Sequence, residues 1–180
     1  MNTEKWAMQI DEISSSFNQN FGNLTIEKLN WKPNSKTWSV AQNIDHLIKI
    51  NESYYPVVKQ IKENNYPLPW TSRIGFFVSF FGKMILNSIQ PHSKRKMKTF
   101  KIWEPISSNF EKTILTSFEK HQIQLKEMIK NSADLIKAKK IISSPANKYI
   151  VYHLDVAFDI IIAHEKRHLE QAKEVLKIQK

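Results

Sequence analysis

The sequence predicts an all-α fold, a four-helix bundle with one or two extra short helices. The chain has only 3 glycines and 7 prolines among 180 residues, too few for the many tight turns of a β-sandwich or barrel. Apolar residues recur at spacings of three and four over several long segments, which is the periodicity of amphipathic helices. An antiparallel bundle is the simplest arrangement that buries all of these apolar faces.

The length and composition predict one helical domain spanning residues 1–180. No repeat, low-complexity tract or long linker interrupts the chain, and hydrophobic residues make up 41% of it, as in ordinary globular domains. The N-terminus lacks the apolar core of a signal peptide. The longest strongly apolar stretch, residues 74–82, is too short to span a bilayer. We therefore expect a cytoplasmic protein with no membrane span.

The first half of the chain predicts three helices. The second of them starts at Ser39-Val-Ala-Gln42, which fits a capping box, because the serine satisfies an early helix N–H and the glutamine reaches back. Pro56 should kink or end that helix, since proline has no backbone donor. Residues 73–89 form the third, very apolar helix. The first helix is predicted from the apolar spacing of Trp6, Ile10, Ile13, Phe17 and Phe21.

The second half predicts two more long helices. Ser108-Asn-Phe-Glu111 is a second match to the capping box and predicts a helix start there. Pro145 lies in a break between elements. From about Leu154, a long last helix is predicted, with apolar positions at Phe158, Ile161, Ile162, Leu169, Ala172, Val175 and Leu176.

Charge and cysteine content limit the possible functions. The formal net charge of +10 suits nucleic acid, an anionic membrane surface or an anionic substrate. The basic residues are scattered, however, and the one dense run, residues 92–98, is predicted to be a solvated basic loop rather than a nucleic-acid site. The absence of cysteine excludes disulfides, cysteine zinc sites and cysteine nucleophiles. A transition-metal site must therefore use histidines and carboxylates.

The segment His164-Glu165-Lys166-Arg167-His168 is an H-E-x-x-H motif inside the predicted last helix. Two histidines four residues apart share one helix face and can bind one metal ion. In zinc proteases the third ligand lies downstream. Only residues 169–180 follow here, without glycine or histidine, so the protease interpretation fails for lack of a third ligand.

A third ligand must therefore come from upstream. His46 and His121 both fall within apolar helical stripes, where a buried imidazole needs a ligand or a hydrogen bond. His92 lies in the basic run and His153 at the start of the last helix. The residues alone favour His46 only slightly over His121. Each of these histidines, taken singly, is also explained as a hydrogen-bonded core or surface residue.

Two segments carry a resemblance to a known family. The first is "LTIEKLNWKPNSKTWSVAQNIDHLIKINESYY", a tryptophan-proline loop followed by a helix with histidine-leucine; the second is "AHEKRHLEQ". The intervening "MKTFKIWEP" also resembles one branch of the same family. In this order the segments resemble the DinB-like (YfiT-like) superfamily of metal-dependent hydrolases and thiol-dependent transferases.

The resemblance implies an up-down-down-up bundle with a three-histidine site for a divalent metal, usually zinc or nickel. It assigns His46, His164 and His168 as the ligands. It also implies a hydrolase or a low-molecular-weight-thiol S-transferase of the bacillithiol type, acting on a small-molecule substrate. Because the chain has no cysteine, the sulfur would belong to a cosubstrate. The alternative is a non-catalytic metal-containing stress-response or binding protein.

Family members often form dimers, and the apolar residues 74–86 offer a surface for a homodimer, although burial in the core explains them as well.

Two residues beside the histidine pair are candidates for catalysis. Glu165 adjoins His164 and is the natural candidate base; the alternative is a surface carboxylate paired with Lys166 or Arg167. Gln171 lies three residues after His168 and can orient a ligand or substrate. Further contacts to the site are expected from Asn43, Asp45 and Glu52, and pocket walls from Trp38 and Tyr55, although such aromatic residues are equally core residues.

Overall fold

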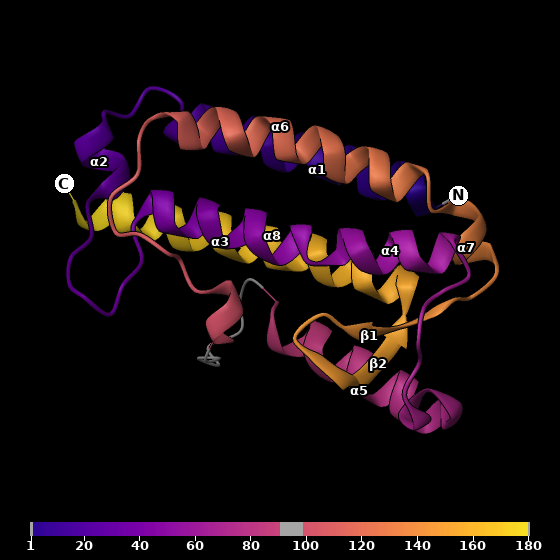
Figure 1. The fold of residues 1–180 in the computed structure, drawn as a ribbon. Helices are drawn as coiled ribbons and strands as arrows, with labels where there is room; N and C mark the ends of the chain where they lie inside the picture. Colours follow the sequence, from indigo (N-terminus) through magenta and orange to yellow (C-terminus); the bar gives the residue numbers. More distant parts are fainter. Residues whose placement is uncertain (1, 91–98, 180) are drawn as a thin grey trace.

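Four long helices form the body of the protein in the computed structural model, which describes residues 2–90 and 99–179. They are α1 (Asn2–Phe21), α3 (Val40–Glu52), α6 (Thr113–Lys130) and α8 (Leu154–Ile178). Helix α4 (Tyr54–Lys62) continues the direction of α3, as Figure 1 shows. The predicted all-α bundle is confirmed.

The four helices run in the order up, down, down, up. In Figure 1, α1 and α8 run from right to left, whereas α3 and α6 run from left to right. Each helix contacts two neighbours, so that α1, α6, α3 and α8 form a closed ring. Helices α3 and α8 are therefore antiparallel neighbours, which brings residues 40–52 beside the last helix of the chain.

Aromatic side chains dominate the centre of the bundle. The rings of Phe17 and Phe118 lie 4.5 Å apart, and those of Trp6 and Phe158 lie 5.3 Å apart. Each fully buried aromatic or aliphatic side chain contributes about 1.5–3 kcal/mol to the free energy of folding. The largest fully buried side chains are Trp6, Tyr152, Phe17, Phe21, Phe118 and Phe158.

The start of α3 is the predicted capping box. The backbone N–H of Gln42 donates to Ser39 Oγ, and the backbone N–H of Ser39 donates to Gln42 Oε1, both at 3.1 Å. The predicted effect of Pro56 is also confirmed: α3 ends at Glu52, and α4 starts at Tyr54 after a break at Ser53.

The second predicted capping box, at residues 108–111, is wrong. Helix α6 begins at Thr113, and no side chain caps it. The reason is a contact from far along the chain: Asn30 Nδ2 donates to the carbonyl of Phe110, and the N–H of Phe110 donates to Asn30 Oδ1, both at 2.7 Å. This amide binds both backbone groups of Phe110, which delays the start of the helix.

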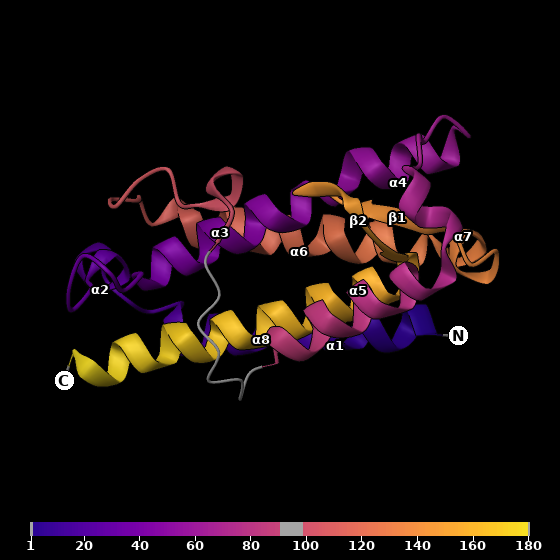
Figure 2. The same ribbon diagram turned by 90° about the horizontal axis from the view of Figure 1, so that it is seen from below.

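A helix and a hairpin lie outside the ring. Helix α5 (Gly75–Ser88), preceded by the 3-10 turn η1 (Trp70–Arg73), matches the predicted apolar helix. It packs on the strand β2 (Asn147–His153), which pairs antiparallel with β1 (Ile141–Ser144). Figure 2 shows α5 lying along α8.

The sequence interpretation missed this hairpin, because strand-length apolar runs do not distinguish a strand from a helix segment. The shorter elements are α2 (Ile26–Asn30), η2 (Lys101–Trp103) and α7 (Ala133–Lys137). The predicted basic loop at residues 92–98 lies outside the described residues. Within residues 2–90 and 99–179, no helix has the length and apolar character needed to cross a membrane.

The capping box at the start of α3 predicts a specific loss of stability. Replacing Ser39 with alanine removes the acceptor of the Gln42 N–H and should lower the free energy of unfolding by about 1–2 kcal/mol. Urea unfolding followed by circular dichroism measures this loss. Ser108→Ala is the matched control, because this exposed serine caps no helix, and its midpoint should not change. Equal losses in the two variants would contradict the assignment.

Candidate metal centre

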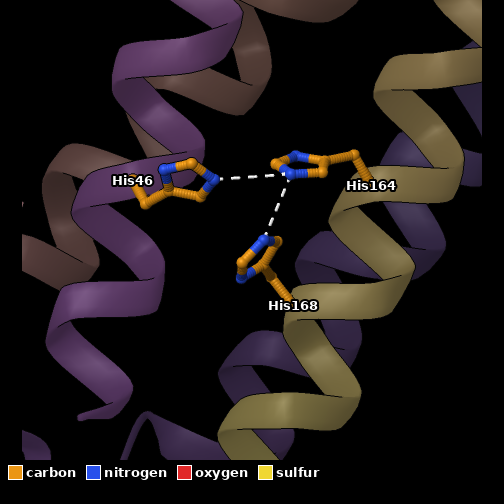
Figure 3. Close-up of side chains that lie close together, drawn as sticks. All are labelled: His46, His164 and His168. Atoms are coloured by element: carbon orange, nitrogen blue, oxygen red, sulfur yellow. Dashed lines mark hydrogen bonds between the residues drawn. The ribbon is translucent and has the colours of Figure 1, made fainter. Parts of the chain in front are cut away.

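Three histidines from two antiparallel helices converge between α3 and α8. His164 and His168 lie one turn apart on α8, and His46 faces them from α3 (Figure 3). Nε2 of His164 lies 3.4 Å from Nε2 of His46 and 3.1 Å from Nε2 of His168. The donor atoms of all three residues lie within 4.8 Å of one another. The structure therefore brings together the three histidines that the resemblance assigned.

Partners on the far side of two rings determine which nitrogen faces the centre. Nδ1 of His46 lies 2.7 Å from the carbonyl oxygen of Trp103, and Nδ1 of His168 lies 2.7 Å from Asn43 Oδ1. Asn43 Nδ2 in turn donates to the Ser39 carbonyl at 2.9 Å, which sets the direction of the amide. Both acceptors assign the proton to Nδ1, so Nε2 of both rings presents a lone pair.

Burial keeps the three imidazoles neutral. Removal from water lowers the pKa of His46 and lowers those of His164 and His168 well below the ordinary value. A proton on His164 or His46 would repel a proton on His168, as the Arg167 guanidinium does, and this repulsion lowers the pKa of His168 further. A neutral imidazole is the form that binds a metal ion, so protons compete weakly for this site.

The donor set fits a cation. With Nε2 of His46 and His168 both unprotonated, His164 has at most one Nε2 hydrogen and can satisfy only one of them. Two nitrogens that share a zinc ion at 2.0–2.1 Å in tetrahedral geometry lie about 3.3–3.4 Å apart. The observed separations of 3.1 and 3.4 Å are close to this value. A divalent ion would satisfy all three lone pairs at once.

A large cavity opens beside the three histidines. Its volume is about 1200 Å³, above the range of about 300–1000 Å³ usual for ligand pockets. The Trp38 ring covers one side of the centre, 4.8 Å from the His46 ring and 5.9 Å from the His168 ring. Gln171 lines the cavity, and its role in orienting a ligand or substrate stays a prediction. Other polar lining residues include Lys36, Gln42, Asn43, Asn51, Glu104, Arg167, Glu170 and Glu174.

Glu165 points elsewhere than its two histidine neighbours. Its side chain is 0% exposed and accepts hydrogen bonds from Asn51 Nδ2 at 2.7 Å and Gln122 Nε2 at 2.9 Å. Burial raises its pKa to about 7, and the two amide donors oppose that rise. The alternative interpretation as a surface carboxylate is wrong. Its role as a base stays a prediction, because Glu165 is not among the cavity-lining residues.

The other candidate residues separate into two groups. Asn43 contacts a ring of the centre and Trp38 covers it. Asp45, Glu52 and Tyr55 do not line the cavity. Asp45 pairs with Lys49 at 2.7 Å, and Glu52 is exposed.

The alternative third ligands lie away from the centre. His121, on α6, contacts Asn51 Nδ2 and the Tyr55 hydroxyl, both at 3.3 Å. Nδ1 of His153 lies 3.1 Å from the Lys139 carbonyl oxygen. His92 lies outside the described residues.

One contributor to the centre was missed by the sequence interpretation. The carbonyl oxygen of Trp103, in η2, accepts from His46. A backbone carbonyl has no residue-type signal, since every residue carries one. Only the path of the chain after α5 places this oxygen behind the imidazole.

The buried His121 predicts a pH dependence of stability. Desolvation lowers its pKa to about 4, from an ordinary value of 6.5. Between these values the unfolded chain binds more protons than the folded one, so stability is lost as the pH falls from about 6.5 toward 4. His121→Gln should reduce the slope of the free energy of unfolding against pH by at most about 1.4 kcal/mol per pH unit. Urea unfolding with a chelator present measures both slopes, and parallel slopes would refute the prediction.

Comparison with known proteins agrees with the family resemblance seen in the sequence. A model of the DinB superfamily matches residues 9–172. Among solved structures, the chain is similar to YfiT from Bacillus subtilis, a probable metal-dependent hydrolase with an unusual four-helix bundle topology. The TM-score is 0.59 at 14% identity, over 98% of this chain and 87% of YfiT. No curated protein sequence matches the chain. The family match covers most of the sequence, and the chain belongs to the DinB superfamily.

Proposed function

We propose that this protein is a divalent-metal-dependent enzyme acting on a small-molecule substrate, either as a hydrolase or as a low-molecular-weight-thiol S-transferase. The observation that carries the proposal is the convergence of three neutral imidazoles at the wall of a large cavity. His46, His164 and His168 are the proposed ligands. The description of YfiT as a probable metal-dependent hydrolase supports the same class of chemistry.

Zinc and nickel are the proposed ions. Imidazole nitrogen suits both ions, and the chain has no cysteine that would add a thiolate ligand. Held by three neutral ligands, such an ion keeps its +2 charge and lowers the pKa of a water or thiol bound to it. The acceptors on Asn43 and Trp103 orient two of the rings and raise their basicity.

The residues around the cavity have distinct proposed roles. Gln171, one turn beyond His168, lines the cavity and presents an amide that can both donate to and accept from a substrate. Glu165 remains a proposed base; at its observed position it holds Asn51, which itself lines the cavity. A transferase would need a thiol cosubstrate such as bacillithiol, and the net charge of +10 suits an anionic one. A cytoplasmic location stays a prediction.

The alternative to catalysis is a non-catalytic protein in which the metal ion is structural or vestigial. Structural zinc sites are closed by four protein ligands, whereas three histidines beside a cavity favour catalysis.

A homodimer also stays a proposal, supported by the apolar row on α5, where Phe76 is 67% exposed and Phe80 is 46% exposed.

Metal binding tests the centre directly. Protein purified anaerobically without chelator should carry about one zinc or nickel ion per chain, because three neutral donors converge there. His46→Ala should abolish this stoichiometry and leave the helical circular dichroism signal intact. The matched control is His121→Gln, which changes a buried histidine outside the centre and should retain the ion. Metal analysis and titration calorimetry provide the readouts. Absence of binding in the unmodified protein would remove the proposal.

Turnover tests the proposed role of Gln171. In a screen of bacillithiol transfer and of ester and amide hydrolysis by metal-loaded protein, Gln171→Ala should lower kcat/KM by roughly tenfold or more, about 1.4 kcal/mol of transition-state stabilisation. Metal content should not change. Gln124→Ala, an exposed glutamine on α6, serves as the control. A metal-loaded protein without turnover in any assay would favour the non-catalytic alternative.

A further inference from the structure

The cavity changes its chemical character along α8. Beyond His168, toward the C-terminus, the lining residues include Gln171 and Glu174; before His164 they include Ile160 and Ile161. Because an α-helix rises 1.5 Å per residue, these groups lie about 5–9 Å along the axis from the nearer of the two histidines, in opposite directions. The first end carries charge and hydrogen-bonding groups. The second end is mainly apolar, with Asn51, Tyr54 and Ser144 as uncharged polar lining residues.

The apolar end is enclosed by three elements, and its walls define what is called here the apolar chamber. Its lining residues are Ile85 and Ile89 of the α5 region, Ile150 and Tyr152 of β2, and Ile160 and Ile161 of α8. None of these six side chains is charged. The charged lining residues among the described part of the chain are Lys36, Glu104, Arg167, Glu170 and Glu174, and none belongs to β2 or α5.

The hydroxyl groups near the chamber are already paired. The Tyr54 and Tyr152 hydroxyls lie 2.9 Å apart, and both side chains are buried. Burial raises the pKa of Tyr54 to about 12 and raises that of Tyr152 well above its ordinary value, so both stay neutral. A charged ligand group placed here would lose its hydration without gaining a counter-ion. The chamber therefore selects for uncharged, apolar groups.

The wall formed by α5 is held close to the centre at two points. Arg167 Nη1 donates to the carbonyls of Ser88 at 3.1 Å and Gln90 at 3.4 Å, which ties the end of α5 to α8. Farther along α5, Gly82 allows close packing, because an added Cβ would lie 2.9 Å from Val156 Cγ1. These contacts place the chamber directly beside the three histidines.

We propose that the substrate carries an uncharged hydrophobic group, a chain or a ring, next to its reacting polar group. The hydrophobic group occupies the apolar chamber, while the reacting group lies at the three histidines. The polar end of the cavity, at Gln171 and Glu174, takes the hydrophilic part or a polar second reactant. This inference rests on the proposed function, since it assumes that chemistry takes place at the histidines.

A chain-length series of metal-binding probes tests the proposal. Straight-chain hydroxamates, from acetohydroxamate to octanohydroxamate, are titrated into zinc-loaded protein by calorimetry. The affinity should rise roughly fourfold for each added methylene until the chamber is filled, from about 0.8 kcal/mol per buried methylene. Ile150→Asn, and independently Ile85→Asn, should flatten the series and leave the affinity for acetohydroxamate unchanged. Both isoleucines are half-buried, and circular dichroism verifies that the two variants fold.

The control is Ile123→Asn on the exposed face of α6, which should leave the series unchanged. An affinity that does not depend on chain length, or a dependence that survives both chamber variants, overturns the proposal. Zinc titration without hydroxamate reports separately on the metal centre. If no zinc binds, 1-alkanols from butanol to octanol are titrated into the protein by tryptophan fluorescence. Affinity that rises with length and is lost in Ile150→Asn supports the chamber; a flat response overturns it.

Discussion

Three imidazole nitrogens that face one another form the main constraint on this bundle. Two of them, on His46 and His168, are directed inward by the acceptors behind their rings, so proton rearrangement alone cannot relieve all of the contacts. Such an arrangement inside a protein is stabilised by a cation. It also requires a constant register between α3 and α8, and the fully buried Ile44 and Leu47 beside His46 provide the packing that maintains it.

The H-E-x-x-H motif divides between two faces of α8 because successive helix residues are rotated by about 100°. His164 and His168 point toward the cavity, whereas Glu165 points toward Asn51 and Gln122 on α3 and α6. The buried carboxylate thus links three of the four bundle helices behind the centre. Its ionisation carries a desolvation cost that the two amide donors partly offset. The histidines and the glutamate of the motif therefore face different parts of the molecule.

Local sequence patterns predicted the features that depend on residues close together in the chain. Helical periodicity identified the long helices, the Ser39 capping box identified the start of α3, and the four-residue spacing paired the two histidines of α8. The residues alone favoured His46 only slightly over His121, since both lie in apolar stripes. That choice depends on which helix adjoins α8, and α6 lies across the ring from it. The Asn30 contact that displaces the start of α6 and the Trp103 carbonyl depend on tertiary structure in the same way.

The wall of the cavity is structurally separable from the ligands. His46, His164 and His168 belong to α3 and α8, two ring helices that share one hydrophobic core. Helix α5 and the hairpin lie outside the ring, although Ile142 and Tyr152 of the hairpin belong to the buried core. A shared fold does not by itself give a shared substrate, and the similarity to YfiT at 14% identity describes the fold alone. In the binding mode proposed above, the hydrophobic group of the substrate contacts Ile85 of α5 and Ile150 of β2, which line the cavity.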